Sequence, residues 1–119
     1  MFNKILDSIV EETGGGIGAI LMGYDGIAIE QVSRDVEGLD LSLVTVEFVS
    51  ALQEIRKAVE ILKLGNLEEV TIKTDKFQTI VRVLNQEYFI ALTVDDQGNL
   101  GKGRYLLSRE KNNLLAALG

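Results

Sequence analysis

The segment that most constrains the fold is residues 88–94, which is apolar on both of its faces. In an extended strand, successive side chains point to opposite sides. Here one set is Tyr88, Ile90, Leu92 and Val94, and the other is Phe89, Ala91 and Thr93. A strand with this pattern is typically covered from both sides. We therefore predict that residues 88–94 form a central strand with a further layer on each face of its sheet.

Four other segments read as strands around this one. Residues 67–74 and 77–84 alternate in polarity and are followed by short polar turns, which predicts a meander leading into the central strand. Earlier, residues 17–23 and 27–32 are apolar runs on either side of Asp25-Gly26. An Asp-Gly pair between two such runs is a strong hairpin signal. The chain thus supplies five strands, two in a hairpin and three in a meander, and we expect them to form an antiparallel sheet.

Three segments carry apolar residues at helical spacing: residues 2–13, 40–64 and 99–118. Gly14 to Gly16 end the first, and Asp40 is the expected N-cap of the second. The element order is helix-strand-strand-helix-strand-strand-strand-helix. We expect an α+β fold, a three-layer α/β/α sandwich around a five-stranded antiparallel sheet, in one domain spanning residues 1–119.

The long helix at residues 40–64 is apolar on two sides. Its main stripe is assigned to the core and comprises Leu41, Val44, Phe48, Leu52, Ile55, Val59 and Leu62. The second side carries Leu43, Val46, Val49, Ser50 and Gln53. Scattered surface valines need no partner, but apolar residues that recur along one side of a helix indicate an interface. We therefore predict a twofold homodimer in which this helix packs antiparallel against its copy.

The strand at residues 67–74 is the candidate second part of that interface. Its outward face carries Glu69, Thr71 and Lys73, and charges of this kind are common on edge strands. An edge strand can pair with the same strand of a second copy, which would extend the sheet. The alternative is a solvated edge that its charges protect from pairing.

Composition excludes several classes of function. The chain has no His and no Cys, which rules out Ser-His-Asp triads, thiolate nucleophiles and His- or Cys-ligated zinc. The formal charge of −6 opposes nucleic acid and anionic membrane surfaces. Charged residues interrupt the N-terminal segment, and no apolar run is long enough to span a membrane. We expect a cytoplasmic protein that neither binds nucleic acid nor inserts into a membrane.

The glycine and carboxylate clusters do not match known cofactor or catalytic motifs. Residues 14–18 follow a helix and enter a strand, the reverse of the geometry that cradles phosphate. Residues 98–103 lack the spacing and the hydroxyl residue of a phosphate-binding loop. The adjacent acidic pairs lie in turns or point apart. We expect no cofactor, no metal and no catalytic residue, so the protein is not an enzyme.

Several segments together resemble the Roadblock (dynein light-chain) domain family over nearly the whole chain. They are the hairpin GAILMGYDGIAIE at residues 18–30, the long helix from Asp40, the hairpin TIVRVLNQEYFIALTVD at 79–95, and NLGKGRYLLSRE at 99–110. The charged connection at residues 33–39 departs from the family pattern. The resemblance implies a profilin- or longin-like fold and a homodimer formed through the second helix and the adjacent strand.

The resemblance also implies a function. Bacterial and archaeal members of this type commonly regulate small Ras-like GTPases as activating or exchange-type partners, without performing chemistry themselves. Stimulated hydrolysis would then use the GTPase's own groups or an arginine supplied in trans. Candidate partner contacts are Arg34, Arg56, Lys57 and Glu60. The alternatives are a dimeric adaptor or scaffold in a motor, motility or trafficking complex and, third, a sensor that binds a small ligand in a profilin-like pocket.

Overall fold

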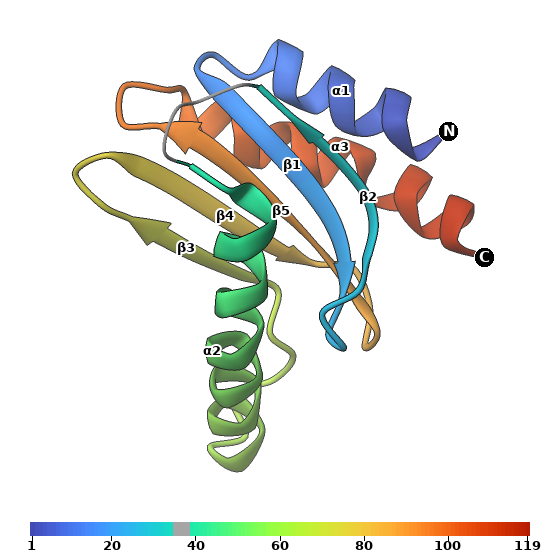
Figure 1. Ribbon diagram of the computed structural model, residues 1–119. Helices are drawn as coiled ribbons and strands as arrows, with labels where there is room; N and C mark the ends of the chain where they lie inside the picture. The colour runs from blue at the N-terminus through green and yellow to red at the C-terminus, as the bar shows by residue number, and fades with distance from the viewer. Residues whose placement is uncertain (35–38) are drawn as a thin grey trace.

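The computed structural model describes residues 1–34 and 39–119. Eight elements follow one another in the predicted order (Figure 1): α1 (Phe2–Glu12), β1 (Gly16–Gly23), β2 (Ala28–Ser33), α2 (Leu41–Ile61), β3 (Glu69–Lys73), β4 (Phe77–Val83), β5 (Tyr88–Asp95) and α3 (Leu100–Leu118). Most of the polar connection expected at residues 33–39 lies outside the described residues.

The five strands form one antiparallel sheet in the order β2-β1-β5-β4-β3. This arrangement confirms that β5 is the central strand, and its residues from Phe89 to Val94 are buried. The hairpin between β1 and β2 turns at Asp25-Gly26, as predicted. Gly26 has a φ of +85°, and the Asp25 carboxylate accepts a hydrogen bond from the Ile27 amide at 3.0 Å. The edges of the sheet are β2 and β3.

Helices cover both faces of the sheet, which confirms the three-layer α/β/α arrangement (Figure 1). The core between the sheet and α1 and α3 includes Leu6, Ile9, Val10, Leu21, Ile80, Ile90, Leu92, Leu106, Leu107 and Leu114. The core beneath α2 includes Ile17, Ile20, Met22, Tyr24, Leu41, Val49, Leu52, Val81 and Phe89. Two helices therefore share one face, whereas α2 covers the other face alone.

The long helix α2 begins where the sequence predicts and ends a turn earlier than expected. Its N-cap is Asp40, whose side chain accepts a hydrogen bond from the Leu43 amide at 3.2 Å. The helix ends at Ile61, because the chain takes a left-handed conformation at Lys63, with a φ of 54°, and again at Gly65. Figure 1 shows that the C-terminal half of α2 extends beyond the sheet.

Candidate interaction site on the second helix

Contacts with the β1–β2 hairpin set the rotation of α2 about its axis. The Ser42 hydroxyl donates a hydrogen bond to the Gln31 side chain on β2. The Gln53 amide donates to the backbone oxygen of Tyr24 at 2.8 Å. Farther along, the Arg56 guanidinium lies 4.0 Å from the centroid of the Tyr24 ring. One flank of α2 therefore faces β1 and β2, and its opposite flank faces β4 and β3.

This rotation corrects the predicted position of Val49. The sequence placed Val49 on the outer side of the helix, but it is only 8% exposed and packs against the sheet. The buried face of α2 comprises Leu41, Thr45, Val49 and Leu52. Thr45 is tolerated there because its hydroxyl donates a hydrogen bond to the Leu41 backbone oxygen at 2.8 Å. Val49 therefore belongs to the protomer core and is not available to a second chain.

An apolar stripe on the flank of α2 toward β3 lacks full cover in the protomer. At about 100° per residue, the residues on this flank are Val44, Phe48, Ala51 and Ile55, which we call the β3-side stripe. Val44 and Phe48 are half-buried, Ala51 is exposed and Ile55 is 36% exposed. The sequence assigned three of these four residues to the core. The structure instead leaves them only partly covered, on the flank of α2 toward the edge strand β3, where Val70 and Ile72 are also half-buried.

The remaining helix residues of the predicted interface lie away from β3. Leu43 and Val46 are exposed and Ser50 is exposed beside them. Gln53 is held against the β1–β2 hairpin by its bond to Tyr24. The structure therefore does not bring these residues together with the predicted strand residues. The sequence could not show this, because the rotation of α2 depends on partners more than ten positions away in the chain.

The edge strand β3 is where the sequence predicted it, but the charge on its outward face is partly neutralised within the protomer. Glu69 forms ion pairs with Arg104 of α3 at 3.0 Å and with Arg82 of β4 at 3.5 Å. The Thr71 hydroxyl accepts a hydrogen bond from Arg104 at 3.3 Å. Lys73 is exposed. Sequence reasoning missed the two arginines, since only the sheet register and the position of α3 bring them to Glu69.

All five arginines of the chain are engaged within the protomer. Arg34 pairs with Glu11 at 2.9 Å and with Asp7 at 3.3 Å, and these hydrogen bonds, that of Glu11 first, raise its pKa. Arg109 pairs with Glu12 and Glu110. Arg56, another of the candidate partner contacts, also has partners within the protomer. It is half-buried over Tyr24 and donates a hydrogen bond to the Gln86 backbone oxygen at 3.4 Å.

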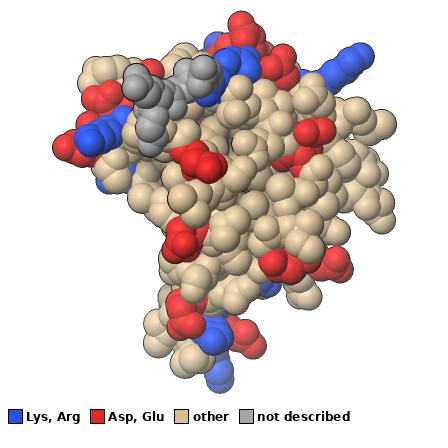
Figure 2. Space-filling model, viewed as in Figure 1, with Lys and Arg blue, Asp and Glu red and all other residues tan. Residues whose placement is uncertain are grey.

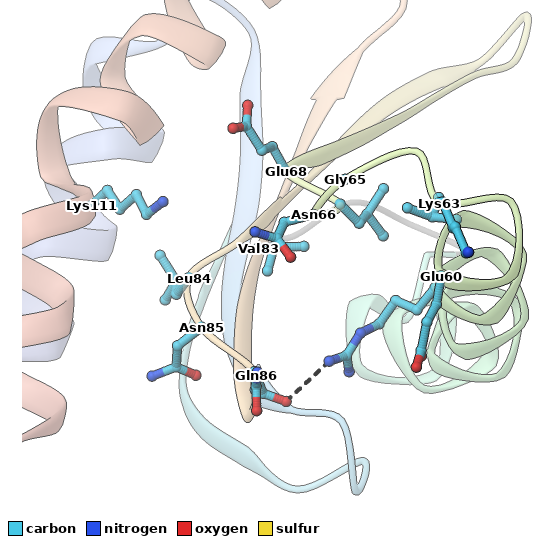
Figure 3. Close-up of a pocket in the computed structure, with 13 residues that line it drawn as sticks. Glu60, Lys63, Gly65, Asn66, Glu68, Val83, Leu84, Asn85, Gln86 and Lys111 are labelled. Carbon is cyan, nitrogen blue, oxygen red and sulfur yellow. Dashed lines mark hydrogen bonds between the residues drawn. The ribbon is translucent and has the colours of Figure 1, made fainter.

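The other two candidate partner contacts lie on the exposed part of α2. Lys57 pairs with Glu54 at 3.3 Å, and Glu60 lines a hollow of about 900 Å³. Figure 3 shows this hollow between α2 and the β4–β5 turn, with Lys111 of α3 on its far side. Its charged lining residues are Arg56, Glu60, Lys63, Glu68 and Lys111. Because these charges are of both signs and nearly balance, the hollow indicates no particular ligand.

Tyr24 carries a buried polar atom that no local pattern in the sequence indicates. Its hydroxyl has no hydrogen-bond partner among residues 1–34 and 39–119, and its ring packs against Phe89 at 5.1 Å between centroids. Burial raises the pKa of Tyr24 above its ordinary value of 10.0, and the charge of Arg56 offsets part of that effect.

Replacing Tyr24 with phenylalanine should therefore not destabilise the protein. An unsatisfied buried polar group costs about 1–3 kcal/mol, so Tyr24→Phe should leave the free energy of unfolding unchanged or raise it by about 1 kcal/mol. Because the pKa of Tyr24 is higher in the folded chain, its ionisation weakens the fold as the pH rises above about 10, and the variant should lose that part of the alkaline decline. Urea unfolding at neutral and alkaline pH measures both effects. Tyr105→Phe, at an exposed position, is the control. A lower free energy of unfolding at neutral pH in Tyr24→Phe, but not in Tyr105→Phe, would contradict the prediction.

Within the described ranges, no group of three or more acidic side chains is arranged to hold a metal ion. Nor does any helix in that part of the chain combine the length and the apolar content needed to cross a membrane.

Solved structures with this fold place the chain among known proteins. MglC from Myxococcus xanthus is 34% identical, with 98% of each chain covered and a TM-score of 0.70. A Roadblock/LC7 domain from Streptomyces avermitilis is 13% identical, with 97% of this chain and 95% of that chain covered and a TM-score of 0.84. The gliding protein MglB from Thermus thermophilus is 15% identical, with 92% and 82% covered and a TM-score of 0.81. No family model matches the chain, and no curated protein sequence does.

Proposed function

The chain belongs to the Roadblock/LC7 domain family, and from that premise we propose that it is a homodimeric, non-enzymatic regulator of a small Ras-like GTPase. In this proposal residues 1–119 form a single domain that acts in the cytoplasm, binds the GTPase and modulates its nucleotide cycle. The observation that carries the proposal is the β3-side stripe of α2, an apolar surface beside a free sheet edge.

A second copy of the chain is the partner that fits this surface. A twofold axis beside β3 would pair the two β3 strands and bring the two copies of α2 together over the joined sheet. The half-buried Phe48 and the exposed Ile55 would then lie at the contact. Of the residues predicted for the interface, Glu69, Thr71 and Lys73 remain part of this proposal through their strand. Leu43, Val46, Ser50 and Gln53 are left for other contacts.

The engagement of the arginines bears on how such a dimer would act on a GTPase. An arginine supplied in trans must leave its own partners, and Arg34 and Arg56 would each give up contacts within the protomer. This favours a regulator that positions the GTPase's own catalytic groups or changes nucleotide exchange. We propose that Lys57 and Glu60, which are exposed on α2, contact the partner directly.

The same observation supports a second candidate function. A dimer without a free arginine could serve as an adaptor that holds a GTPase or other components of a motility complex together and leaves nucleotide turnover unchanged. The structural likeness to a protein named for gliding agrees with a place in motility.

The test uses a purified Ras-like GTPase from the same genome and measures its binding, hydrolysis and exchange with and without this protein. A regulator binds and changes one of the two rates, whereas an adaptor binds and changes neither. The double charge reversal Lys57→Glu with Glu60→Lys should weaken binding about tenfold or more. Lys76→Glu, at the exposed β3–β4 turn, should have no effect. Absence of binding to every such GTPase would contradict both functions.

A further inference from the structure

The second edge of the sheet, β2, borders another apolar surface that neither the proposed dimer nor the protomer core uses. Ile27 and Ile29 on the hairpin are 63% and 40% exposed, and Leu43 and Val46 on α2 are 58% and 45% exposed. We call these four residues the β2-side patch. Large apolar side chains gathered on one side of a domain mark interaction sites more often than single exposed ones do.

The hydrogen bonds that fix α2 also place the two halves of the patch along the same stretch. Ser42 bonds to Gln31 at one end, and Gln53 bonds to the backbone of Tyr24 at the other. Val46 lies between the two helix residues in sequence, and Ile29 lies between the two hairpin residues. The helix α2 and the strand β2 therefore lie alongside each other between these two hydrogen bonds, and Val46 and Ile29 both lie within that stretch. Of the labelled helices and strands in Figure 1, none lies beyond the outer edge of β2.

Among the described residues, only β1 pairs with β2, on its inner edge. The Arg34 amide points inward, toward the neighbouring strand β1, and donates a hydrogen bond to the Ile17 oxygen at 2.6 Å. Because inward and outward amides alternate along an antiparallel edge strand, the amides of Gln31 and Ser33 point outward. The Gln31 amide bonds only to the neighbouring Glu30 carboxylate, at 3.0 Å. Edge strands are usually protected by proline or lysine, and β2 contains neither.

The charge around this edge specifies the partner. The acidic residues on or next to the two elements that carry the patch are Asp25, Glu30, Asp40 and Glu47; Glu54 of α2 is paired with Lys57. Figure 2 shows the same face as a broad uncharged surface, with acidic side chains along its sides and charged side chains of both signs at its top and at the lower end of α2. In a strand added beside β2, alternate side chains would lie on opposite faces of the sheet. The side chains on the same face as Ile29 would meet apolar groups, and those on the same face as Glu30 would meet a carboxylate.

We propose that the β2 edge and the β2-side patch form a docking site for an extended segment of a partner protein in which apolar residues alternate with lysine or arginine. The segment adds a sixth strand to the sheet, takes the Gln31 and Ser33 amides as backbone partners and displaces the Glu30 carboxylate from Gln31. This site lies at the opposite edge from β3, so it requires neither the dimer nor a GTPase. In a dimer joined at β3, one such site would remain free at each end of the sheet.

A synthetic ten-residue peptide of alternating valine and lysine is the probe, with the full-length protein. We expect amide hydrogen exchange to slow at Gln31 and Ser33 when the peptide binds. A peptide with serine in place of each valine should bind about tenfold more weakly or worse, because it buries no apolar surface. Ile29→Lys should weaken binding by a similar factor through lost burial and charge repulsion, without changing the mass of the protein in solution.

Gln31→Pro tests the backbone pairing separately, since proline removes the outward amide and is tolerated on edge strands. Its control is Ser42→Ala, which also loses the Ser42–Gln31 bond but keeps the amide. We expect the proline variant to lose peptide binding and the alanine variant to retain it. The proposal is overturned if the peptide does not bind, if the serine peptide binds equally well, or if the slowed amides lie on β3. Equal binding by wild type and Ile29→Lys would overturn it too, even if Gln31→Pro failed to fold.

Discussion

Replacing Ile55 with glutamate should convert the proposed dimer into folded monomers. In the protomer this side chain is 36% exposed on the β3-side stripe, so a carboxylate there can be hydrated without disturbing the core. In the dimer the same position would bury two copies of the residue near a twofold axis. Losing an apolar side chain costs about 1.5–3 kcal/mol at each copy, and two facing carboxylates repel. The dissociation constant should rise by a factor of about 100 or more, as sedimentation velocity would measure.

The matched control for that variant is Leu43→Glu, the same change on the exposed outer side of the same helix. This variant should still sediment as a dimer, with the mass of two chains. Circular dichroism establishes that both variants remain folded. If Ile55→Glu stays dimeric, or if Leu43→Glu dissociates instead, the chains associate through a different face of α2.

Gly16→Ala should strongly destabilise the fold. A Cβ atom at this position would lie 2.4 Å from the Val10 backbone oxygen and 3.3 Å from the Thr13 oxygen. Val10 belongs to the last turn of α1 and Thr13 is the C-cap of that helix, and the Gly16 amide already donates to the Thr13 oxygen at 3.0 Å. Backbone atoms cannot rotate away as a side chain can, so α1 would have to shift from its core contacts. We expect a loss of about 3 kcal/mol or more in the free energy of unfolding.

Gly14→Ala is the control for Gly16→Ala. It separates the clash with the Val10 backbone oxygen from the general effect of replacing a glycine in this loop. A Cβ at Gly14 would lie 3.5 Å from the Asn99 Cβ, an ordinary van der Waals distance. Its effect on the free energy of unfolding should be within about 1 kcal/mol. Urea titrations at one protein concentration compare the two, and similar values for both would mean that α1 yields readily at Gly16.

Local patterns were sufficient to predict the architecture. The two-sided apolar segment at 88–94 became the central strand, the Asp25-Gly26 pair became a hairpin, and Asp40 became an N-cap. Each of these features depends on residues a few positions apart, so the sequence contains the whole signal. The end of α2 was less accurate, because the left-handed conformation at Lys63 has no sequence marker.

The faces of α2 could not be predicted in the same way. Apolar residues occur around most of this helix, so periodicity alone does not say which of them face the sheet. Hydrogen bonds from Ser42 and Gln53 to the β1–β2 hairpin set the rotation, and they connect residues 11 and 29 positions apart. The result buries Val49 and leaves Ile55 exposed, the reverse of the sequence assignment. The ion pairs of Arg34 and Glu69 were missed for the same reason.

Because the chain contains no cysteine, a single introduced thiol on β3 tests most directly whether two copies pair at that edge. Val70→Cys, Thr71→Cys and Ile72→Cys scan the middle of the strand, and directly opposed residues in paired strands have Cβ atoms about 5 Å apart. Under mild oxidation, at least one of the three variants should form a covalent dimer rapidly. Ala28→Cys on the β2 edge should stay at the 13.1 kDa of one chain. Cross-linking at Ala28 with none at β3 would contradict a dimer joined through α2 and β3.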